Sequence, residues 1–214
     1  KKKIKVLNNG SISGVNTSLF KFDSRARDLF RNNYQIDPTS IVIGFVGRVC
    51  KDKGVISLYL TFKKLLIHFP NLTLILIGSD EEHLIKNKIL KLDNNFIHIK
   101  HSENIEKILP GFDIFCLPSE REGLPISILE ASSCEIPILG SNIYGVKDCV
   151  LNRKTGLLYN DTQDLYKKLQ ILIKDKNLRG KYGNAGRRFI MGSFDQKVVV
   201  KSYVEEISKI MKLA

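Results

Sequence analysis

From residue 41 onward, short apolar runs rich in β-branched residues alternate with longer amphipathic runs. We interpret the apolar runs as six β-strands, at residues 41–46, 72–77, 96–99, 114–117, 137–139 and 155–159. Strands this apolar are typical of a parallel sheet that helices cover on both faces. The pattern therefore predicts an α/β fold: a Rossmann-like, doubly wound parallel sheet of about six strands with helices on both faces.

The amphipathic runs between the strands predict helices. Leu58 and Leu65 mark a helix that ends before Pro70, and we also expect helices over 81–92 and 126–134. Residues 162–214 predict two or three further helices. The apolar face of the last helix is formed by Val199, Tyr203, Ile207 and Ile210.

Four cysteines are present, none in a Cys-x-x-Cys pair, so we expect reduced and mostly buried thiols and no metal site: Cys50, Cys116, Cys134 and Cys149. The three lysines at residues 1–3 lead into no long apolar run, and no stretch approaches the ~20 apolar residues of a membrane span. These features predict a cytoplasmic protein.

The formal net charge of +12 is unevenly distributed, because residues 151–214 hold 14 Lys and Arg against 6 Asp and Glu. Such an excess favours an anionic partner, such as nucleic acid, an anionic membrane surface or a phosphorylated substrate. Arg187 and Arg188 are candidates for contact with phospholipid headgroups, although a solvated helix face explains them as well. The basic residues are scattered without interleaved aromatics, which disfavours nucleic acid.

In doubly wound folds, ligands bind outside the carboxyl ends of the strands. The loop after the first strand, residues 47–54, contains Gly47, Arg48, Lys53 and Gly54. Glycines admit a ligand close to the backbone, and Arg and Lys charges beside a helix start favour phosphate. The loop is neither a Gly-Lys-Ser/Thr phosphate loop nor a Gly-x-Gly-x-x-Gly dinucleotide loop. By itself it is better explained as an ordinary strand-to-helix turn.

The loop after the fourth strand carries a pair of carboxylates, Glu122 and Glu130, with Gly123, Leu124 and Pro125 between them. Pro125 suits a helix start, and Gly123 lets the loop approach a ligand. Carboxylate oxygens accept strong hydrogen bonds from sugar hydroxyls. One carboxylate for a ribose and one for a hexose would explain the pair, although a glycosidase also uses two carboxylates.

These motifs together resemble the retaining glycosyltransferases of family 4, which have the GT-B fold. Glu122 and Glu130 match the family's Glu-x-seven-Glu motif, and residues 47–54 match its Gly-Arg…Lys-Gly loop. Residues 113–118 resemble its Ala-Asp-hydrophobic-hydrophobic-hydrophobic-Pro-Ser run, and 137–145 its next strand and glycine loop. Residues 10–20 resemble the segment before its domain core. The resemblance covers nearly the whole chain and identifies it as the C-terminal, donor-binding domain.

The resemblance also implies roles for individual residues. Arg48 and Lys53 would hold the donor diphosphate, and Glu122 would contact the transferred sugar. Glu130 would bind the ribose hydroxyls. The backbone at Gly47, Gly123 and Leu124 would lie against the donor. The base would lie near the loop that contains His101 and Ser102.

The function implied by this resemblance is metal-independent, retaining transfer of a hexosyl group from a nucleotide sugar, UDP-linked by family frequency, in cell-surface polysaccharide synthesis. We expect residues 1–214 to form one domain, with an interdomain segment at 1–22 and a C-terminal helix at 195–214. A glycan or lipid-linked acceptor would bind a separate N-terminal domain, without which this chain would be inactive. No cofactor is expected, and peripheral contact with the inner face of a membrane stays open. The alternative is a non-catalytic nucleotide-sugar-binding module.

Overall fold

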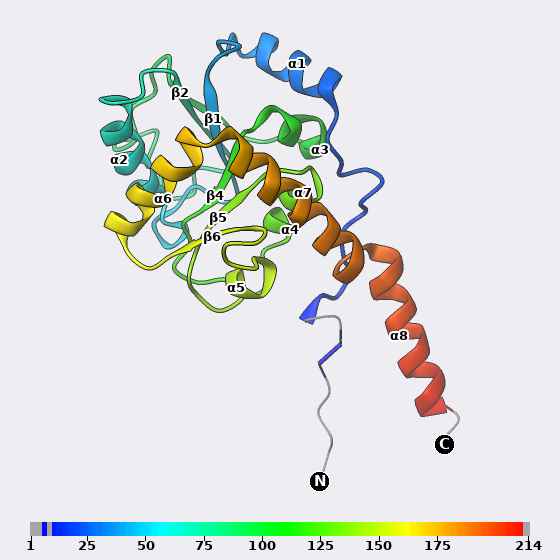
Figure 1. The fold of residues 1–214 in the computed structure, drawn as a ribbon. Coiled ribbons are helices and arrows are strands. Elements are labelled where there is room, and N and C mark those ends of the chain that lie inside the picture. The colour runs from blue at the N-terminus through cyan, green and yellow to red at the C-terminus, as the bar shows by residue number, and fades with distance from the viewer. Residues whose placement is uncertain (1–5, 8–9, 212–214) are drawn as a thin grey trace.

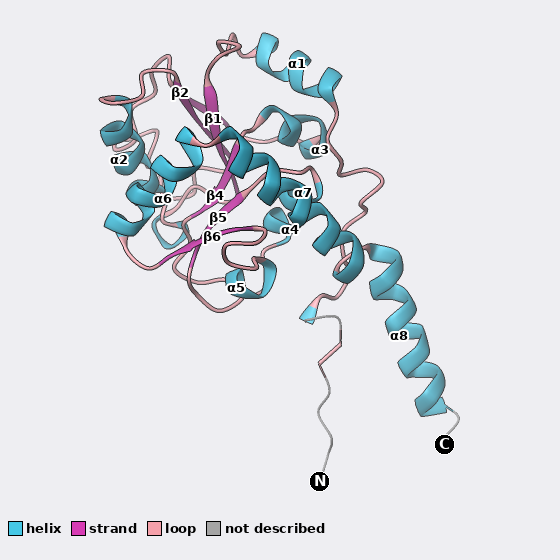
Figure 2. Ribbon diagram, viewed as in Figure 1, coloured by secondary structure: helices cyan, strands magenta, loops and turns pink. Residues whose placement is uncertain are grey.

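The computed structural model describes residues 6–7 and 10–211 and confirms the predicted fold class. Six parallel strands form one sheet in the order β3-β2-β1-β4-β5-β6, with helices on both faces (Figures 1 and 2). The strands are β1 (Ile41–Val46), β2 (Leu72–Ile77), β3 (Phe96–Ile99), β4 (Ile114–Leu117), β5 (Ile138–Ser141) and β6 (Gly156–Tyr159). The first four match the predicted ranges, and the last two differ by one or two residues at their ends.

One helix precedes the sheet, most of the others lie between strands, and three follow the last strand. They are α1 (Ser24–Asn33), η2 (Lys51–Lys53), α2 (Val55–Leu66), α3 (Ile105–Ile108), η3 (Leu109–Gly111), α4 (Ile126–Ser133), α5 (Val146–Cys149), α6 (Thr162–Lys174), α7 (Lys176–Ser193) and α8 (Gln196–Met211). Helices that cover the sheet also pack against one another: α2 contacts α6, and α4 contacts α7. Every residue of β2 and β4 is buried, which is the physical reason for their unbroken apolar sequence.

The helix predicted over residues 81–92 is wrong, because the chain forms successive turns there. Asp80 explains the difference: its carboxylate accepts hydrogen bonds from the backbone amides of Leu84, Ile85 and Lys86. Such local side-chain acceptors compete with a helical ladder. His83 and Lys88 also have positive φ angles of 55° and 58°, which a right-handed helix does not allow.

A helix that the sequence pattern did not predict, α1, precedes the sheet and is fixed to its amino edge by Asp113. Arg27 and Arg31 both donate to this carboxylate, and the backbone amide of Val42 donates to it as well. The Asp of the family-like run at 113–118 therefore joins α1 to two neighbouring strands. Its role in this chain is structural.

The C-terminal part forms three helices, and the last of them extends away from the body of the molecule (Figure 1). Of its predicted apolar face, Val199 is fully buried, whereas Ile207 and Ile210 are 55% and 62% exposed. The chain before α1 lies beside α8: Val15 forms a bridge with Asp195, and the Tyr203 hydroxyl donates to the carbonyl of Ser11. The outermost residues of the predicted segments 1–22 and 195–214 lie outside the described residues.

Two further expectations can be compared with the structure. All four cysteines are free and buried, as predicted. Arg187 is 21% exposed, and its guanidinium donates to the carbonyls of Thr17, Phe20 and Ser133, which gives it a structural role. Arg188 is exposed, and contact of this pair with phospholipid stays a prediction. In the part of the chain that the structure describes, no helix is both long and apolar enough to cross a bilayer.

Candidate functional site

The order of the strands reverses between β1 and β4, and the loops that follow these two strands meet at the carboxyl edge of the sheet. The amide of Glu120 donates to the carbonyl of Asp52 across 2.8 Å, which joins the two loops. Gly54 has a φ of +66°, and a Cβ at this position would overlap the carbonyl of Pro118. Such a reversal is where open α/β sheets bind ligands.

A cavity of about 280 Å³ opens between these loops. Five of the predicted site residues line it: Gly47, Arg48, Lys53, Glu122 and Leu124. The other lining residues are Val46, Leu117, Pro125, Ile126 and Ser127. The structure thus brings the loop after β1 and Glu122, which are far apart in sequence, to one site.

Glu122 is fixed by two hydrogen bonds at the wall of this cavity. Its Oε1 accepts from the Lys53 ammonium and from the Ser119 hydroxyl, both at 2.7 Å. The side chains of Lys53 and Glu122 are 15% and 14% exposed, so the ion pair is largely shielded from water. Within the described residues, no donor reaches its Oε2, which remains available to a ligand hydroxyl.

Arg48 is more open, with half of its side chain exposed. Its guanidinium pairs with Glu81 at 2.9 Å and lies 3.6 Å from Asp52. Water screens an ion pair as exposed as this one, so Glu81 holds the Arg48 guanidinium only weakly. Glu81 follows β2, and no motif in the sequence indicated that it would reach Arg48.

The backbone at Gly123 is exposed, and a Cβ built there would meet no protein atom within 4 Å. Nothing inside the protein therefore requires glycine at this position, which leaves its surface open to a ligand. The opposite holds for Gly145, whose φ is +77° and whose Cβ would overlap the carbonyl of Gly123. Gly145 thus packs directly against the backbone of this loop, whereas Gly123 exposes the loop backbone to solvent.

Glu130 lies in α4 and does not line the cavity of Glu122. No hydrogen bond from the described residues reaches its carboxylate. Burial, and after it the charge of Glu106 in α3, raise the pKa of Glu130 to about 7. A half-buried carboxylate with a raised pKa and no partner is a candidate binding group.

His101 and Ser102 lie in the loop between β3 and α3, outside the cavity of Glu122. The Ser102 hydroxyl accepts from the amide of Asn104 and so shapes the loop. Contact of this pair with a base stays a prediction. Ser119, whose hydroxyl positions Glu122, was not among the residues selected from the sequence. Ser119 directly follows the run at 113–118, and the Pro-Ser end of the family's run was a signal for it. Across the described ranges, no group of three or more metal-ligating side chains is present.

Comparison with known proteins assigns the family. Residues 26–189 match the model described as glycosyl transferases group 1. The chain is 31% identical over 203 residues to the capsular polysaccharide biosynthesis glycosyltransferase CapM of Staphylococcus aureus. That alignment covers 92% of this chain and 53% of CapM, so the chain spans about half the length of its relative. The chain belongs to the group 1 glycosyltransferases.

Solved structures share the fold at lower identity. Anabaena HepE in complex with UDP superposes with a TM-score of 0.84 at 20% identity, covering 92% of this chain and 56% of HepE. The C-terminal domain of the group 1 protein LpcC from Francisella tularensis gives a TM-score of 0.76 at 24% identity. That match covers 85% of this chain and 99% of the LpcC domain. These likenesses show that the chain shares the Rossmann-like fold of these domains.

Proposed function

We propose that this chain is the donor-binding half of a retaining glycosyltransferase and that it holds a UDP-sugar at the cavity between β1 and β4. The observation that carries the proposal is the meeting of Arg48, Lys53 and Glu122 at that cavity. Two cations beside one carboxylate suit a ligand that joins a diphosphate to a sugar. The UDP complex of HepE and the polysaccharide role in the name of CapM support the same assignment.

In this proposal, the two cations bind the diphosphate that leaves during transfer. Negative charge grows on the leaving group, and preorganised cations stabilise that charge most strongly in the transition state. Arg48 exchanges Glu81 for a phosphate oxygen. Lys53 lies between Glu122 and the phosphate position, and so joins the sugar and diphosphate ends of the site.

Glu122 contacts the transferred hexose through its open Oε2, while Oε1 keeps its bonds to Lys53 and Ser119. Glu130 binds the ribose hydroxyls, whose hydrogen bonds favour the ionised carboxylate. The acceptor, a glycan or a lipid-linked sugar, binds a second domain that faces this cavity. The match covers 99% of the LpcC C-terminal domain but only 53% of CapM. We therefore assign acceptor binding to the other half of the enzyme.

Calorimetric titration with UDP in the presence of a chelator tests the proposal. We expect saturable binding of UDP without divalent metal, and tighter binding of at least one UDP-sugar. A ligand at 100 times its dissociation constant should also stabilise the fold by ~2.7 kcal/mol. Binding that appears only after magnesium or manganese is added would overturn metal independence. Absence of binding by every nucleoside diphosphate would overturn the donor site.

A further inference from the structure

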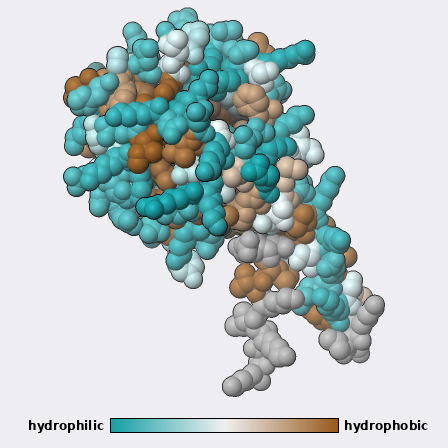
Figure 3. Space-filling model, viewed as in Figure 1, coloured by the Kyte–Doolittle hydropathy of each residue, from teal (hydrophilic) through white to brown (hydrophobic). Residues whose placement is uncertain are grey.

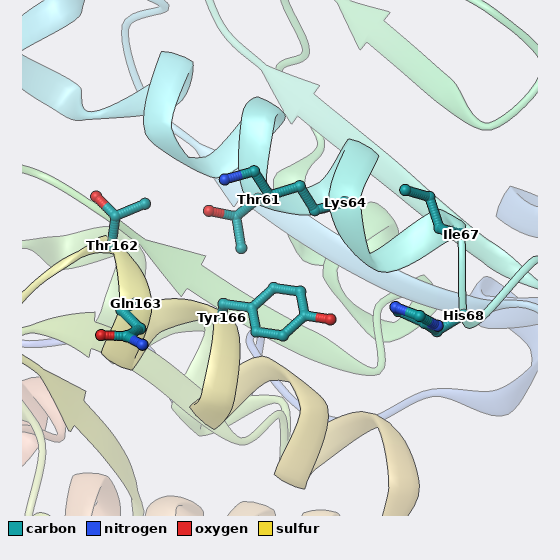
Figure 4. Close-up of a pocket in the computed structure, with 7 residues that line it drawn as sticks. All are labelled: Thr61, Lys64, Ile67, His68, Thr162, Gln163 and Tyr166. Carbon is teal, nitrogen blue, oxygen red and sulfur yellow. The ribbon is translucent and has the colours of Figure 1, made fainter.

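A cavity of about 560 Å³ between α2 and α6 offers few polar groups to a ligand (Figure 4). Lys64 is the one lysine or arginine among its described lining residues, and the Thr61 hydroxyl is buried beneath the surface. Figure 3 shows apolar residues gathered over the side of the molecule where α2 and α6 lie. A ligand with a charged group therefore finds little to bind there.

A different cavity, of about 420 Å³, lies at the amino edge of the sheet, where β4 and β5 begin. Asp113, which precedes β4, lines this cavity, whereas Leu117 at the end of β4 lines the donor cavity. The length of β4, roughly 13 Å, separates the two. The volume is within the range of small-molecule sites, and the proposed sugar transfer uses none of the lining residues.

One face of α7 forms a wall of this cavity. Its lining residues recur at helical spacing and so lie on one side of the helix: Lys176, Arg179, Gly180 and Asn184. The start of α7 is already capped, because the Asp175 carboxylate accepts from the amide of Leu178. Any binding group on this wall is therefore a side chain and not the helix N-terminus.

The Arg179 guanidinium uses only part of its hydrogen-bonding capacity. Its Nη1 donates to the carbonyls of Leu172 and Ile173 in the last turn of α6, at 2.6 and 2.9 Å. Within the described ranges, its Nε and Nη2 have no acceptor, and neither atom is sealed off from the surface. A lysine could also cap the end of a helix, whereas a guanidinium adds a planar edge with two parallel N–H groups. That edge matches the two oxygens of a carboxylate.

The protein does not compensate the charge of Arg179 with an ion pair. Burial lowers the pKa of its guanidinium, and Asp113 and Asp175 only partly oppose this effect. Neither carboxylate forms an ion pair with Arg179 in the part of the chain that the structure describes. A half-buried cation without an ion pair destabilises the free protein, and a bound anion would remove that cost.

The two carboxylates that line the cavity are already paired with other arginines. Asp113 binds two arginines of α1, and Glu135 lies 3.7 Å from the Nε of Arg187. Lys176 adds a second cation, which is exposed and has no ion pair among the described residues. Two nearby carboxylates repel a doubly charged phosphate more strongly than a ligand with one negative charge. The charges of the cavity therefore favour a carboxylate ligand.

Gly180 leaves room beside Arg179 for the body of such a ligand. A Cβ at this position would meet no protein atom within 4 Å, so packing does not require glycine here. Glycine is also one of the weakest helix formers, and Gly180 lies inside α7. The cavity is lined as well by the apolar side chains of Phe22, Ile136 and Pro137, and Phe22 is 46% exposed. These surfaces suit a flat or cyclic body.

We propose that the cavity at the amino edge of the sheet binds a small aromatic or cyclic carboxylic acid. The Nε and Nη2 of Arg179 hold its carboxylate, Lys176 adds a second positive charge, and the ring lies over Gly180 and against Phe22. The inference does not depend on the proposed sugar transfer.

Titration with benzoate, followed by nuclear magnetic resonance, tests the site, with benzamide as an uncharged probe of the same shape. Benzoate should bind saturably, and benzamide should bind at least tenfold more weakly. Arg179→Lys keeps the charge but removes the planar edge, so it should weaken benzoate binding roughly tenfold. Lys176→Gln should weaken it about two- to fivefold, because this cation is exposed.

Gly180→Leu tests the site without weakening the fold. The leucine side chain fills the cavity, so benzoate binding should be lost, while the melting temperature should be equal or higher because leucine is the stronger helix former. The matched control is Gly192→Leu, in the same helix but outside the cavity, where a Cβ would also meet no atom within 4 Å. Its benzoate affinity should equal that of the parent.

The proposal is overturned if benzoate does not bind, if benzamide binds equally well, or if the two leucine variants behave alike. Tighter binding of phenyl phosphate than of benzoate would overturn the assigned class of ligand. Loss of benzoate binding in Lys53→Met would place the probe in the donor cavity and would overturn the proposal as well.

Discussion

The turn into α4 and the helix itself each carry one glutamate of the pair, and the two side chains occupy opposite kinds of environment. Glu122 in the turn accepts two hydrogen bonds at 2.7 Å, from Lys53 and Ser119. Glu130 in the helix has no donor among the described residues, and burial raises its pKa to about 7. One carboxylate is held in place by the fold, whereas the other costs the fold stability.

This difference separates two ways in which a binding carboxylate is prepared. Glu122 is positioned before the ligand arrives, with one oxygen used for its support and the other open. Glu130 lacks such support, so in the proposed donor site its hydrogen bonds would come from the ligand. A group that destabilises the free protein is expected where binding, and not folding, requires it.

The largest effect is expected from Lys53→Met, which removes the cation shared by Glu122 and the proposed diphosphate. UDP affinity should fall by about a hundredfold, since a charged hydrogen bond is lost and the shielded Glu122 carboxylate is left beside the phosphate. Calorimetry measures the change. Lys51→Met is the matched control, because Lys51 lies in the same short helix but outside the cavity. Equal losses in both variants would show that general charge, and not this site, attracts UDP.

The next effect concerns Glu130 and stability. The pKa of Glu130 is raised from the ordinary 4.5 to about 7, so ionisation favours the unfolded chain as pH rises between these values. Glu130→Gln should therefore match the parent below about pH 4.5 and exceed it above pH 7 by roughly 1–3 kcal/mol. Thermal melts across pH 4–8 measure this. A variant no more stable than the parent at pH 8 would mean that the carboxylate has a stabilising partner.

Glu130 should also make nucleotide binding depend on pH. If the ribose hydroxyls require the ionised carboxylate, the group must lose its proton on binding at pH 6. UDP affinity should then be about tenfold lower at pH 6 than at pH 8. Comparison with Glu130→Gln removes the contribution from titration of the phosphate itself. The same pH dependence in parent and variant would exclude Glu130 from the ribose site.

Glu122→Gln should discriminate between ligands. UDP lacks the sugar that Glu122 contacts, so its affinity should change by less than about threefold. A UDP-sugar should bind roughly tenfold more weakly, because a hydrogen bond to a charged group is lost. Transfer by the complete enzyme should fall as well. Equal effects on UDP and on the UDP-sugar would refute the assignment of Glu122 to the hexose.

The smallest effect is expected from Ser119→Ala, which removes the second support of Glu122. Loss of this buried hydrogen bond should destabilise the fold by about 1 kcal/mol, or roughly 2–4 °C in melting temperature. UDP affinity should be nearly unchanged, while binding of a UDP-sugar weakens slightly because Glu122 is less well fixed. A loss of UDP affinity as large as that in Lys53→Met would mean that Ser119 contacts the diphosphate directly.

The sequence by itself determined the sheet and the loops that could hold a ligand. Strands 41–46 and 72–77 were predicted at their observed bounds because chain buried on both faces must be continuously apolar. Where such strands end, the polar loops follow, so Arg48, Lys53 and Glu122 could be chosen as site residues before any contact was known. These features depend only on residues that are close together in the chain, so the pattern of apolar and polar residues is enough to predict them.

Only the tertiary structure decided how those residues are paired. Lys53 and Glu122 are 69 positions apart, and their contact depends on the reversal of strand order between β1 and β4. The helix expected over 81–92 fails because Asp80 captures three backbone amides, and α1 is placed by an aspartate more than 80 residues away. The raised pKa of Glu130 arises from burial and from Glu106 on another helix. Burial and long-range hydrogen bonding are properties of the packed chain, so no periodicity in the sequence records them.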